Sequence, residues 1–270
     1  MSNHHIPDKK NRIITISNQK GGVGKTTTAV NLASCLAAAE KKTLLIDIDP
    51  QANACSGLGY KSPNGHKHIY EVLLELEAIE NVINPTQIEC LHLLPSNISL
   101  IGAEIELINC SSREYRLKEA LEKIRDLYDY IIIDCPPSLG LLTVNSLTAS
   151  DSLLIPIQCE YYALEGISQL LKTVEFIKKE LNRQLQVEGV LLTMFDRRTN
   201  LSIQVAEEIH HPFKNLVFKT YIPRNVSLSE APSHGMPIIL YDIRSKGAEA
   251  YLKLAHEVIF DGPKGAWKGA

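Results

Sequence analysis

The sequence has little that would mark a membrane-spanning or secreted protein. None of its apolar runs approaches the roughly 18–20 residues that a membrane-spanning helix needs. The first twelve residues, MSNHHIPDKKNR, are polar and lack the apolar centre of a secretory signal peptide. The six cysteines form no C-x-x-C pair, which argues against a zinc site and a disulfide framework. We therefore expect a cytoplasmic protein whose cysteines are mostly small buried residues.

The chain also lacks a strong excess of either charge. Its 28 Lys and Arg residues and 31 Asp and Glu residues give a formal net charge of -3. Any binding to nucleic acid or to an acidic membrane must therefore come from a local basic patch. No Pro-, Gly- or Ser-rich linker, repeat or low-complexity block divides the 270 residues. We predict one domain over residues 12–260, between a flexible N-terminus at 1–11 and a flexible tail at 261–270.

What the chain does have is an alternation of short apolar runs with longer helical patterns. Near-continuous apolar runs indicate strands that are covered on both faces, as in a parallel sheet. The predicted strands are 12–17, 43–47, 91–94, 130–134, 152–157, 187–194 and 217–222. The predicted helices include 26–39, 117–127, 165–181, 201–209 and 248–260. This order predicts an α/β fold with a doubly wound, mostly parallel sheet and helices on both faces.

A glycine-rich loop, KGGVGKTT, follows the first predicted strand and opens the first predicted helix. This is the setting that the phosphate-binding pattern G-x-x-x-x-G-K-[ST] requires. Gly21, Gly22 and Gly24 let the backbone approach phosphate oxygens, and the N–H groups at the helix N-terminus hold negative charge. Lys25 would reach the β- and γ-phosphates, and Thr26 offers a hydroxyl to Mg²⁺. The loop therefore predicts a site for a nucleotide with Mg²⁺.

Three carboxylates follow predicted strands at the edge of the sheet where this loop lies. Asp134 ends YIIID, and Asp47 and Asp49 end TLLIDID. Ligands of open α/β sheets bind at the carboxyl ends of the strands, so we expect Asp134 to hold Mg²⁺ through water. The spacing of Asp47 and Asp49 points both to one side of the extended chain. One of them would orient the attacking water; the alternative is that both only cap a loop.

Lys20 is a second lysine that the phosphate-binding pattern does not require. After KGGVGKTT the chain contains, in order, LLIDIDPQAN, DYIIIDCPPSLG, QCEYYALEG and TYIPRNVSLSEAPSHGMPI. Together these motifs, from about residue 12 to 260, resemble the ParA/Soj branch of the deviant Walker A ATPases. The resemblance is to the short chromosomal type, because about a dozen residues precede the first predicted strand. That is too few for an N-terminal helix-turn-helix domain.

The resemblance implies a role for each site residue. Lys20 would cross the interface of an ATP-bound sandwich dimer and contact the phosphates of the other subunit, as an arginine finger does. Lys20, Lys25 and Asp49 would be catalytic, with Asp49 positioning the hydrolytic water. Asp47, Asp49, Asp134 and Gly21 would form the switch and the interface. The implied nucleotide contacts are Lys20, Gly21, Gly22, Val23, Gly24, Lys25, Thr26 and Thr27, with Met194, Pro223 and Asn225 at the adenine.

The resemblance also implies that a dimer with bound ATP and Mg²⁺ binds double-stranded DNA without sequence preference. Arg198 matches one position that the family uses for DNA, whereas Ser227 stands where many members have arginine. The candidate DNA contacts are Arg197, Arg198, Arg224, Arg244 and Lys246. The implied protein is a slow ATPase at the nucleoid that segregates chromosomes or plasmids with a ParB-like centromere-binding protein.

Three other classes of protein share parts of this pattern. A MinD-like membrane-cycling ATPase needs a basic amphipathic C-terminal helix, but 248–260 is typical of an ordinary packed helix, so no stable membrane anchor is expected. Trp267, between two lysines, is the one hint of an interfacial anchor. An iron–sulfur reductase needs cysteines in glycine-rich settings, and Cys135 is followed by two prolines. A metabolic P-loop kinase leaves EYYALEG and IPRN unexplained.

Overall fold

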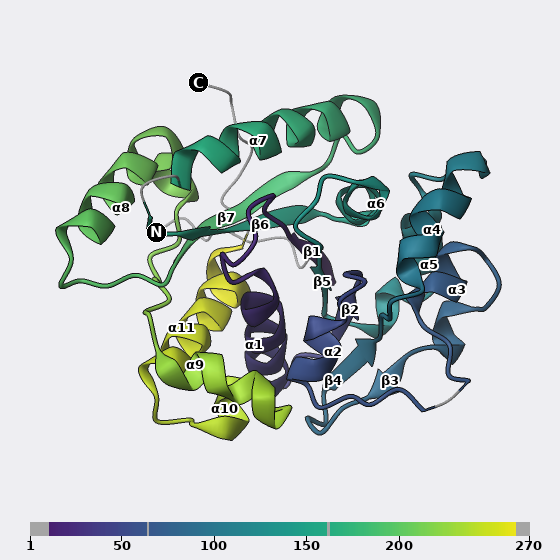
Figure 1. The fold of residues 1–270 in the computed structure, drawn as a ribbon, viewed down its shortest axis with the longest axis horizontal. Coiled ribbons are helices and arrows are strands. Elements are labelled where there is room, and N and C mark those ends of the chain that lie inside the picture. The colour runs from purple at the N-terminus through teal and green to yellow at the C-terminus, as the bar shows by residue number, and fades with distance from the viewer. Residues whose placement is uncertain (1–10, 64, 161–162, 263–270) are drawn as a thin grey trace, which may run out of the picture.

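The computed structural model describes residues 11–63, 65–160 and 163–262, and its centre is a seven-stranded sheet (Figure 1). The strand order is β3-β4-β2-β5-β1-β6-β7, and only the β3–β4 pair is antiparallel. This confirms the predicted α/β fold with a mostly parallel sheet. The strands are β1 (Arg12–Ile16), β2 (Thr43–Asp47), β3 (Asn84–Pro85), β4 (Leu91–Leu94), β5 (Tyr130–Asp134), β6 (Ser152–Gln158) and β7 (Gln186–Thr193).

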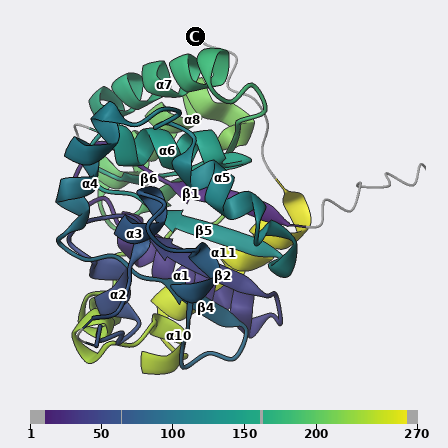
Figure 2. The same cartoon turned by 90° about the vertical axis from the view of Figure 1, so that its right-hand side faces the viewer.

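Helices cover both faces of this sheet. They are α1 (Lys25–Ala38), α2 (Asn53–Gly57), α3 (Ile69–Leu73), α4 (Leu100–Glu106), α5 (Arg116–Glu122), α6 (Leu141–Ala149), α7 (Ala163–Glu180), α8 (Asn200–Phe213), α9 (Val226–Glu230), α10 (Ile238–Tyr241) and α11 (Lys246–Asp261). Figure 1 shows α1 and α11 on one face and α7 and α8 on the other. In Figure 2, α7 and α8 lie at the opposite end of the molecule from α10. Within the described ranges, no helix combines the length and the apolar character needed to cross a bilayer.

The alternation of side chains along the strands divides the core between the two faces. Ile14 and Leu154 pack with residues of α1 and α11. Their neighbours point the other way: Ile13 packs beneath α3 to α6, and Leu153 packs beneath α7 and α8. Every residue of β1, β2 and β5 is buried, which explains why these strands are continuous apolar runs in the sequence.

The strand predicted at residues 217–222 is wrong. This segment, all of it described, makes only isolated bridges near its two ends. The Glu257 carboxylate of α11 accepts hydrogen bonds from the backbone N–H groups of Lys219 (2.8 Å) and Thr220 (3.2 Å). Because a side chain takes these two donors, they are not available for a ladder with β7.

Other predictions differ from the structure in smaller ways or fall outside the described residues. The helix predicted at 117–127 is α5 followed by a 3₁₀ turn at Arg125–Leu127. The ends predicted to be flexible lie outside the described residues, except for Asn11, Asp261 and Gly262; Trp267 lies outside them as well. The six cysteines are mostly buried, as expected: Cys35, Cys55, Cys135 and Cys159 are buried, and Cys90 and Cys110 are half-buried.

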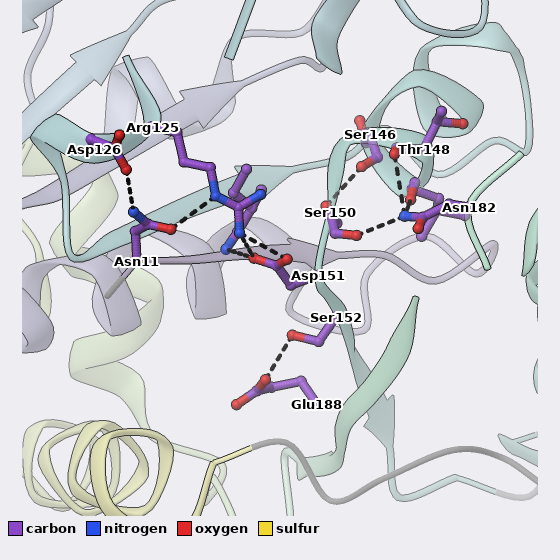
Figure 3. Close-up of polar contacts among 12 residues, drawn as sticks. Asn11, Arg125, Asp126, Ser146, Thr148, Ser150, Asp151, Ser152, Asn182 and Glu188 are labelled. Carbon is purple, nitrogen blue, oxygen red and sulfur yellow. Dashed lines mark hydrogen bonds and ion pairs between the residues drawn. The ribbon is translucent and has the colours of Figure 1, made fainter. Parts of the chain in front are cut away.

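Polar contacts join the amino ends of β1 and β6, at the edge opposite the phosphate-binding loop (Figure 3). Arg125 Nη2 donates to both carboxylate oxygens of Asp151, at 2.9 and 2.7 Å. Asp151 also accepts a hydrogen bond from the backbone N–H of Ile13 at 2.9 Å. Nearby, Asn182 Nδ2 donates to the carbonyl oxygen of Ser150 at 2.7 Å. These bonds fix the start of β6 against β1, so the opposite ends of the strands are held in register too.

A buried ion pair between Arg12 and Glu188 completes this edge. The side chain of Arg12 is 11% exposed and that of Glu188 is fully buried. Glu188 also accepts a hydrogen bond from Ser152 Oγ (2.7 Å), and Arg12 Nη1 donates to the Val258 carbonyl of α11 (2.8 Å). The pair therefore connects three strands with the last helix.

We expect Glu188→Ala to lower the free energy of unfolding by about 3–5 kcal/mol, because it leaves a buried guanidinium without its counter-ion. Urea denaturation at pH 7 measures the loss. Glu249→Ala is the matched control, since Glu249 and Lys253 form an ion pair whose side chains are 63% and 64% exposed, and such surface pairs add little to stability. An equal loss in the two variants would contradict the structural role of the buried pair.

Candidate functional site

The phosphate-binding loop runs from the end of β1 into the first turn of α1. Gly22 and Gly24 have positive φ angles of 73° and 88°, which residues with a Cβ adopt only with strain. The Val23 carbonyl accepts a hydrogen bond from the hydroxyl of Thr193, at the end of β7 (2.8 Å). The loop is therefore tied to the sheet while Gly21 and Gly22 remain exposed, which leaves its backbone open to a ligand.

Lys25 is buried at the start of α1, with its Nζ 3.1 Å from the carbonyl oxygen of Lys20. Burial lowers the pKa of Lys25, while the negative charges of Asp134 and Asp49 act in the opposite direction. The structure thus brings this predicted phosphate ligand into one buried cluster with two of the predicted carboxylates. An ammonium in such a cluster favours a ligand that carries several negative charges.

Asp134 lies at the end of β5 and is fully buried. Within the described residues, neither of its carboxylate oxygens has a hydrogen-bond partner. Burial raises the pKa of Asp134 well above its usual range and the charge of Asp47 raises it further, whereas the hydroxyl of Thr26 opposes the shift. A buried carboxylate without partners is costly, and oxygen ligands are those that Mg²⁺ prefers. Thr26 and Asp134 therefore fit a bound magnesium ion.

Asp47 and Asp49 shape the loop that follows β2. Asp47 accepts hydrogen bonds from the backbone N–H groups of Asp49 (3.1 Å) and Cys55 (3.0 Å). Burial raises the pKa of Asp47 to about 6, although these hydrogen bonds oppose the shift. Asp49 is 6% exposed and uses one carboxylate oxygen to accept from the Gln51 N–H (2.9 Å). Both acids thus cap this loop, and Asp49 also lies close enough to Lys25 to affect its pKa.

A cavity of about 410 Å³ opens beside the loop, a size suited to a small ligand. Gly24 and Thr27 line one side, and the three residues predicted at the adenine, Met194, Pro223 and Asn225, line the cavity with them. Met194 has a φ of 51°, a left-handed conformation that is uncommon for this residue type and often marks functional sites. The Asn225 Oδ1 already accepts the capping hydrogen bond of α9 (3.1 Å).

The backbone of Lys20 belongs to the phosphate-binding loop, whereas its side chain lies at the protein surface. Its backbone carbonyl accepts from Lys25, and its N–H donates to Asn18 Oδ1 at 3.0 Å. Its Nζ lies 3.6 Å from Glu160 Oε2, and the two side chains are 36% and 47% exposed. The ammonium group of Lys20 is therefore beside the phosphate-binding loop, paired with a surface carboxylate.

Four of the five candidate DNA residues line a groove of about 1470 Å³ along α11: Arg197, Arg198, Arg224 and Lys246. The lining does not include Arg244. Ser227 stands where the family often has arginine, and its hydroxyl donates a hydrogen bond to the carboxylate of Asp242 at 3.2 Å.

The cations of this groove differ in whether an acid compensates them. Arg198 donates two hydrogen bonds to the carboxylate of Asp196, at 2.9 and 2.7 Å, which hold the pKa of Asp196 well below its usual range. Over the part of the chain that the structure describes, no ion pair engages Arg197, Arg224 or Lys246. These three side chains are therefore cations of the groove without an ion pair. The charge of Arg224 nevertheless also lowers the pKa of Asp196, and that of Lys246 adds to the lowering of the pKa of Glu249 by Lys253.

Sequence reasoning missed three polar residues around the site. Thr193 fixes the phosphate-binding loop, Glu160 pairs with Lys20, and the Ser96 hydroxyl donates to the Asp49 carbonyl at 2.8 Å. Ser96 follows the carboxyl end of β4. The principle that ligands bind at the carboxyl ends of parallel strands, which pointed to Asp134, therefore points to Ser96 as well. Glu160 lies within the motif QCEYYALEG, to which no role was assigned.

Known proteins match this chain over most of its length. A family model described as an AAA domain matches residues 11–187. The sporulation initiation inhibitor protein Soj of Bacillus subtilis is 61% identical over 251 residues, which cover 93% of this chain and 99% of that protein. The chromosome partitioning protein ParA of Myxococcus xanthus is 59% identical over 248 residues, which cover 92% of this chain and 88% of that protein.

Solved structures share the fold over nearly the whole chain. A structure of cobyrinic acid a,c-diamide synthase from Mycobacterium smegmatis, with bound ADP and magnesium, has a TM-score of 0.82 and 35% identity and covers 96% of this chain and 100% of its own. The cell division ATPase MinD of Pyrococcus furiosus has a TM-score of 0.76 and 27% identity and covers 92% and 98%. With the two curated relatives, these findings show that the chain belongs to the ParA/Soj family of chromosome-partitioning ATPases.

Proposed function

We propose that this partitioning ATPase works as an ATP-dependent homodimer that binds DNA without sequence preference. In this proposal the dimer drives the segregation of a chromosome or plasmid, together with a ParB-like partner. The observation that carries the proposal is the position of Lys20. A phosphate-binding loop needs one lysine, and here the second one holds its ammonium group at the surface, 3.6 Å from Glu160.

Within one subunit, the site binds ATP through the loop backbone and Lys25. Lys25 supplies positive charge to the β- and γ-phosphates, and Met194, Pro223 and Asn225 surround the adenine. Thr26 and Asp134 hold Mg²⁺, Asp134 through water. When bound, Mg²⁺ supplies positive charge that neutralises the phosphate oxygens.

Between subunits, Lys20 acts in trans. Two triphosphates that face each other across a two-fold axis repel unless cations lie between them. Lys20 leaves Glu160 and contacts the phosphates of the other subunit, so that dimerisation depends on the γ-phosphate. The same contact stabilises negative charge in the transition state. The exposed Gly21 contributes to this interface.

Asp49 orients the water that attacks the γ-phosphate, and hydrolysis returns the subunits to the monomeric state. A carboxylate that also caps its own loop is a modest catalyst, and no arginine is placed at the phosphates in this proposal. The intrinsic rate of ATP hydrolysis is therefore slow, and a partner protein can increase it.

DNA binds along the groove of α11 through Arg197, Arg224 and Lys246, none of which is engaged in an ion pair among the described residues. The dimer presents two such grooves, so a chain with a net charge of -3 still offers a basic surface to phosphates. Contacts to phosphate alone explain binding without sequence preference and place the dimer at the nucleoid.

Lys25→Ala is expected to weaken nucleotide binding by about 100-fold, because it removes the only buried cation that the proposal places at the phosphates (about 3 kcal/mol for a charged hydrogen bond). Titration with a fluorescent ATP analogue and Mg²⁺ measures the affinity. Lys42→Ala, at an exposed lysine before β2, is the control and should bind normally. Unchanged affinity in Lys25→Ala would count against the loop assignment.

Lys20→Ala is expected to bind ATP normally yet fail to dimerise, because its ammonium group acts only on the other subunit. Sedimentation velocity with a slowly hydrolysed ATP analogue separates monomer from dimer. Glu160→Gln is the matched control, since it removes the same ion pair but keeps Lys20, and it should still dimerise. A normal ATP-dependent dimer in Lys20→Ala would refute the action in trans.

Fluorescence anisotropy of a random-sequence DNA duplex across a salt series tests the DNA surface. We expect binding with ATP but not with ADP. The double variant Arg224→Ala and Lys246→Ala should flatten the slope of log affinity against log salt by about 0.9 for each phosphate that the protein no longer neutralises. Lys179→Ala on α7, on the opposite face of the sheet, should leave the slope unchanged. Binding to anionic liposomes instead of DNA would favour a MinD-like function.

A further inference from the structure

An exposed apolar stripe runs along the helical segment that contains α4. It consists of Ile98, Ile101, Ile105 and Ile108, which are 62%, 51%, 67% and 57% exposed. Ile101 and Ile105 lie on α4, Ile98 in the turn before it and Ile108 in the 3₁₀ turn at Leu107–Asn109, and the spacings of three, four and three residues align all four along one side of this segment. Single exposed apolar residues are common on proteins, but four large ones in one row mark an interaction surface.

The opposite face of the same segment is already used by the core. Leu100, Ala103 and Leu107 are fully buried and pack in the cluster beneath α3 to α6. A short helix that is apolar on two sides is expected to be covered on both. The exposed isoleucines of the stripe are therefore not needed for the hydrophobic core of this chain.

The segment contacts two loops of the proposed nucleotide site, the one that carries Asp49 and the one that follows Asp134. Before it, the Ser96 hydroxyl donates to the Asp49 carbonyl at 2.8 Å. Within it, the Glu104 carboxylate lies against Gly140, in the loop between Asp134 and α6. A protein that binds the stripe is therefore separated from each loop by a single residue.

The charges around the stripe select the occupant. From residue 91 to residue 112 the chain contains Glu104 and Glu106 but no Lys or Arg, and Arg113, which donates to the Ile108 carbonyl at 2.9 Å, is already paired with Glu114. DNA and anionic lipid would be repelled by these acids. A second copy of this chain would bring the same acids together across a two-fold axis. A basic segment with apolar residues at helical spacing is complementary in both charge and shape.

We infer that the stripe is the docking surface for a basic amphipathic helix of the partner that stimulates ATP hydrolysis. This inference rests on the proposed function, because it assigns a place to the partner named there. Docking at the stripe displaces Ser96 and Glu104 together, and these two residues transmit the movement to Asp49 and to the loop after Asp134. The partner thus controls hydrolysis without entering the nucleotide site.

The test uses the full chain and the purified ParB-like protein of the same genome. In the double variant Ile101→Asp and Ile105→Asp, we expect the affinity for the partner and its stimulation of hydrolysis to fall at least ten-fold. Basal hydrolysis, the ATP-dependent dimer and DNA binding should remain at wild-type levels. Ile203→Asp is the matched control, an isoleucine of α8 that is 40% exposed, and it should be stimulated normally.

Two milder variants keep the test decisive if the double variant fails to fold. Ile105→Ser changes the most exposed member of the stripe, and we expect it to lower stimulation several-fold. Glu106→Gln removes one acid of the rim, and we expect it to weaken partner binding two- to five-fold and to reduce its salt dependence.

The outcomes separate this inference from the proposed function. If wild type is stimulated and the stripe variants are stimulated equally, the inference is wrong and the proposed function stands. If the partner does not stimulate wild type, the partner clause of the proposed function fails and the inference fails with it. If the stripe variants lose the ATP-dependent dimer, the stripe contacts a second copy and the inference is overturned.

Discussion

Lys25 and the carboxylates of Asp47, Asp49 and Asp134 are buried together at the carboxyl edge of the sheet, where little of their surface is exposed to solvent. Burial raises the pKa values of Asp47 and Asp134 and lowers that of Lys25, so each group is less stable in its charged form than at the surface. A rigid sheet makes this possible. The polar contacts at the opposite edge, around Asp151 and Glu188, hold β1, β6 and β7 together, and β1 leads into the loop that carries Lys25.

The two lysines of the phosphate-binding loop lie in different environments, one in the interior of the molecule and one at its surface. Lys25 stays in the buried cluster, and Lys20 reaches the surface beside Glu160. In the proposed function, Lys25 binds the γ-phosphate inside one subunit and Lys20 contacts the phosphates of the other. The presence of a γ-phosphate therefore determines whether the surface around Lys20 forms a dimer interface. The basic groove along α11 and the apolar stripe along α4 lie on opposite faces of the sheet, so that DNA and a partner can be bound at once.

Local sequence predicted most of the sheet because its strands are buried on both faces. RIITI, TLLID and YIIID are apolar almost throughout, and the positions of β1, β2 and β5 agree with the prediction to within a residue. The same reasoning failed at 217–222, where VFKTYI is rich in β-branched and aromatic residues. There, the backbone N–H groups of Lys219 and Thr220 donate to Glu257, which is 37 or more residues away in the chain. The local sequence pattern cannot predict these hydrogen bonds.

By itself the sequence determined the phosphate-binding loop, the acids that follow the strands and the parallel order of the fold, because each depends on residue types at short spacing. Only the tertiary structure decided which charges are compensated. It paired Arg198 with Asp196 and left Arg197, Arg224 and Lys246 without an ion pair among the described residues. It also placed Ser96 beside Asp49 and left four isoleucines exposed on a helix whose other side is in the core. Burial and ion pairing depend on tertiary contacts between segments that are far apart in the chain, and a local sequence pattern does not show which segments come into contact.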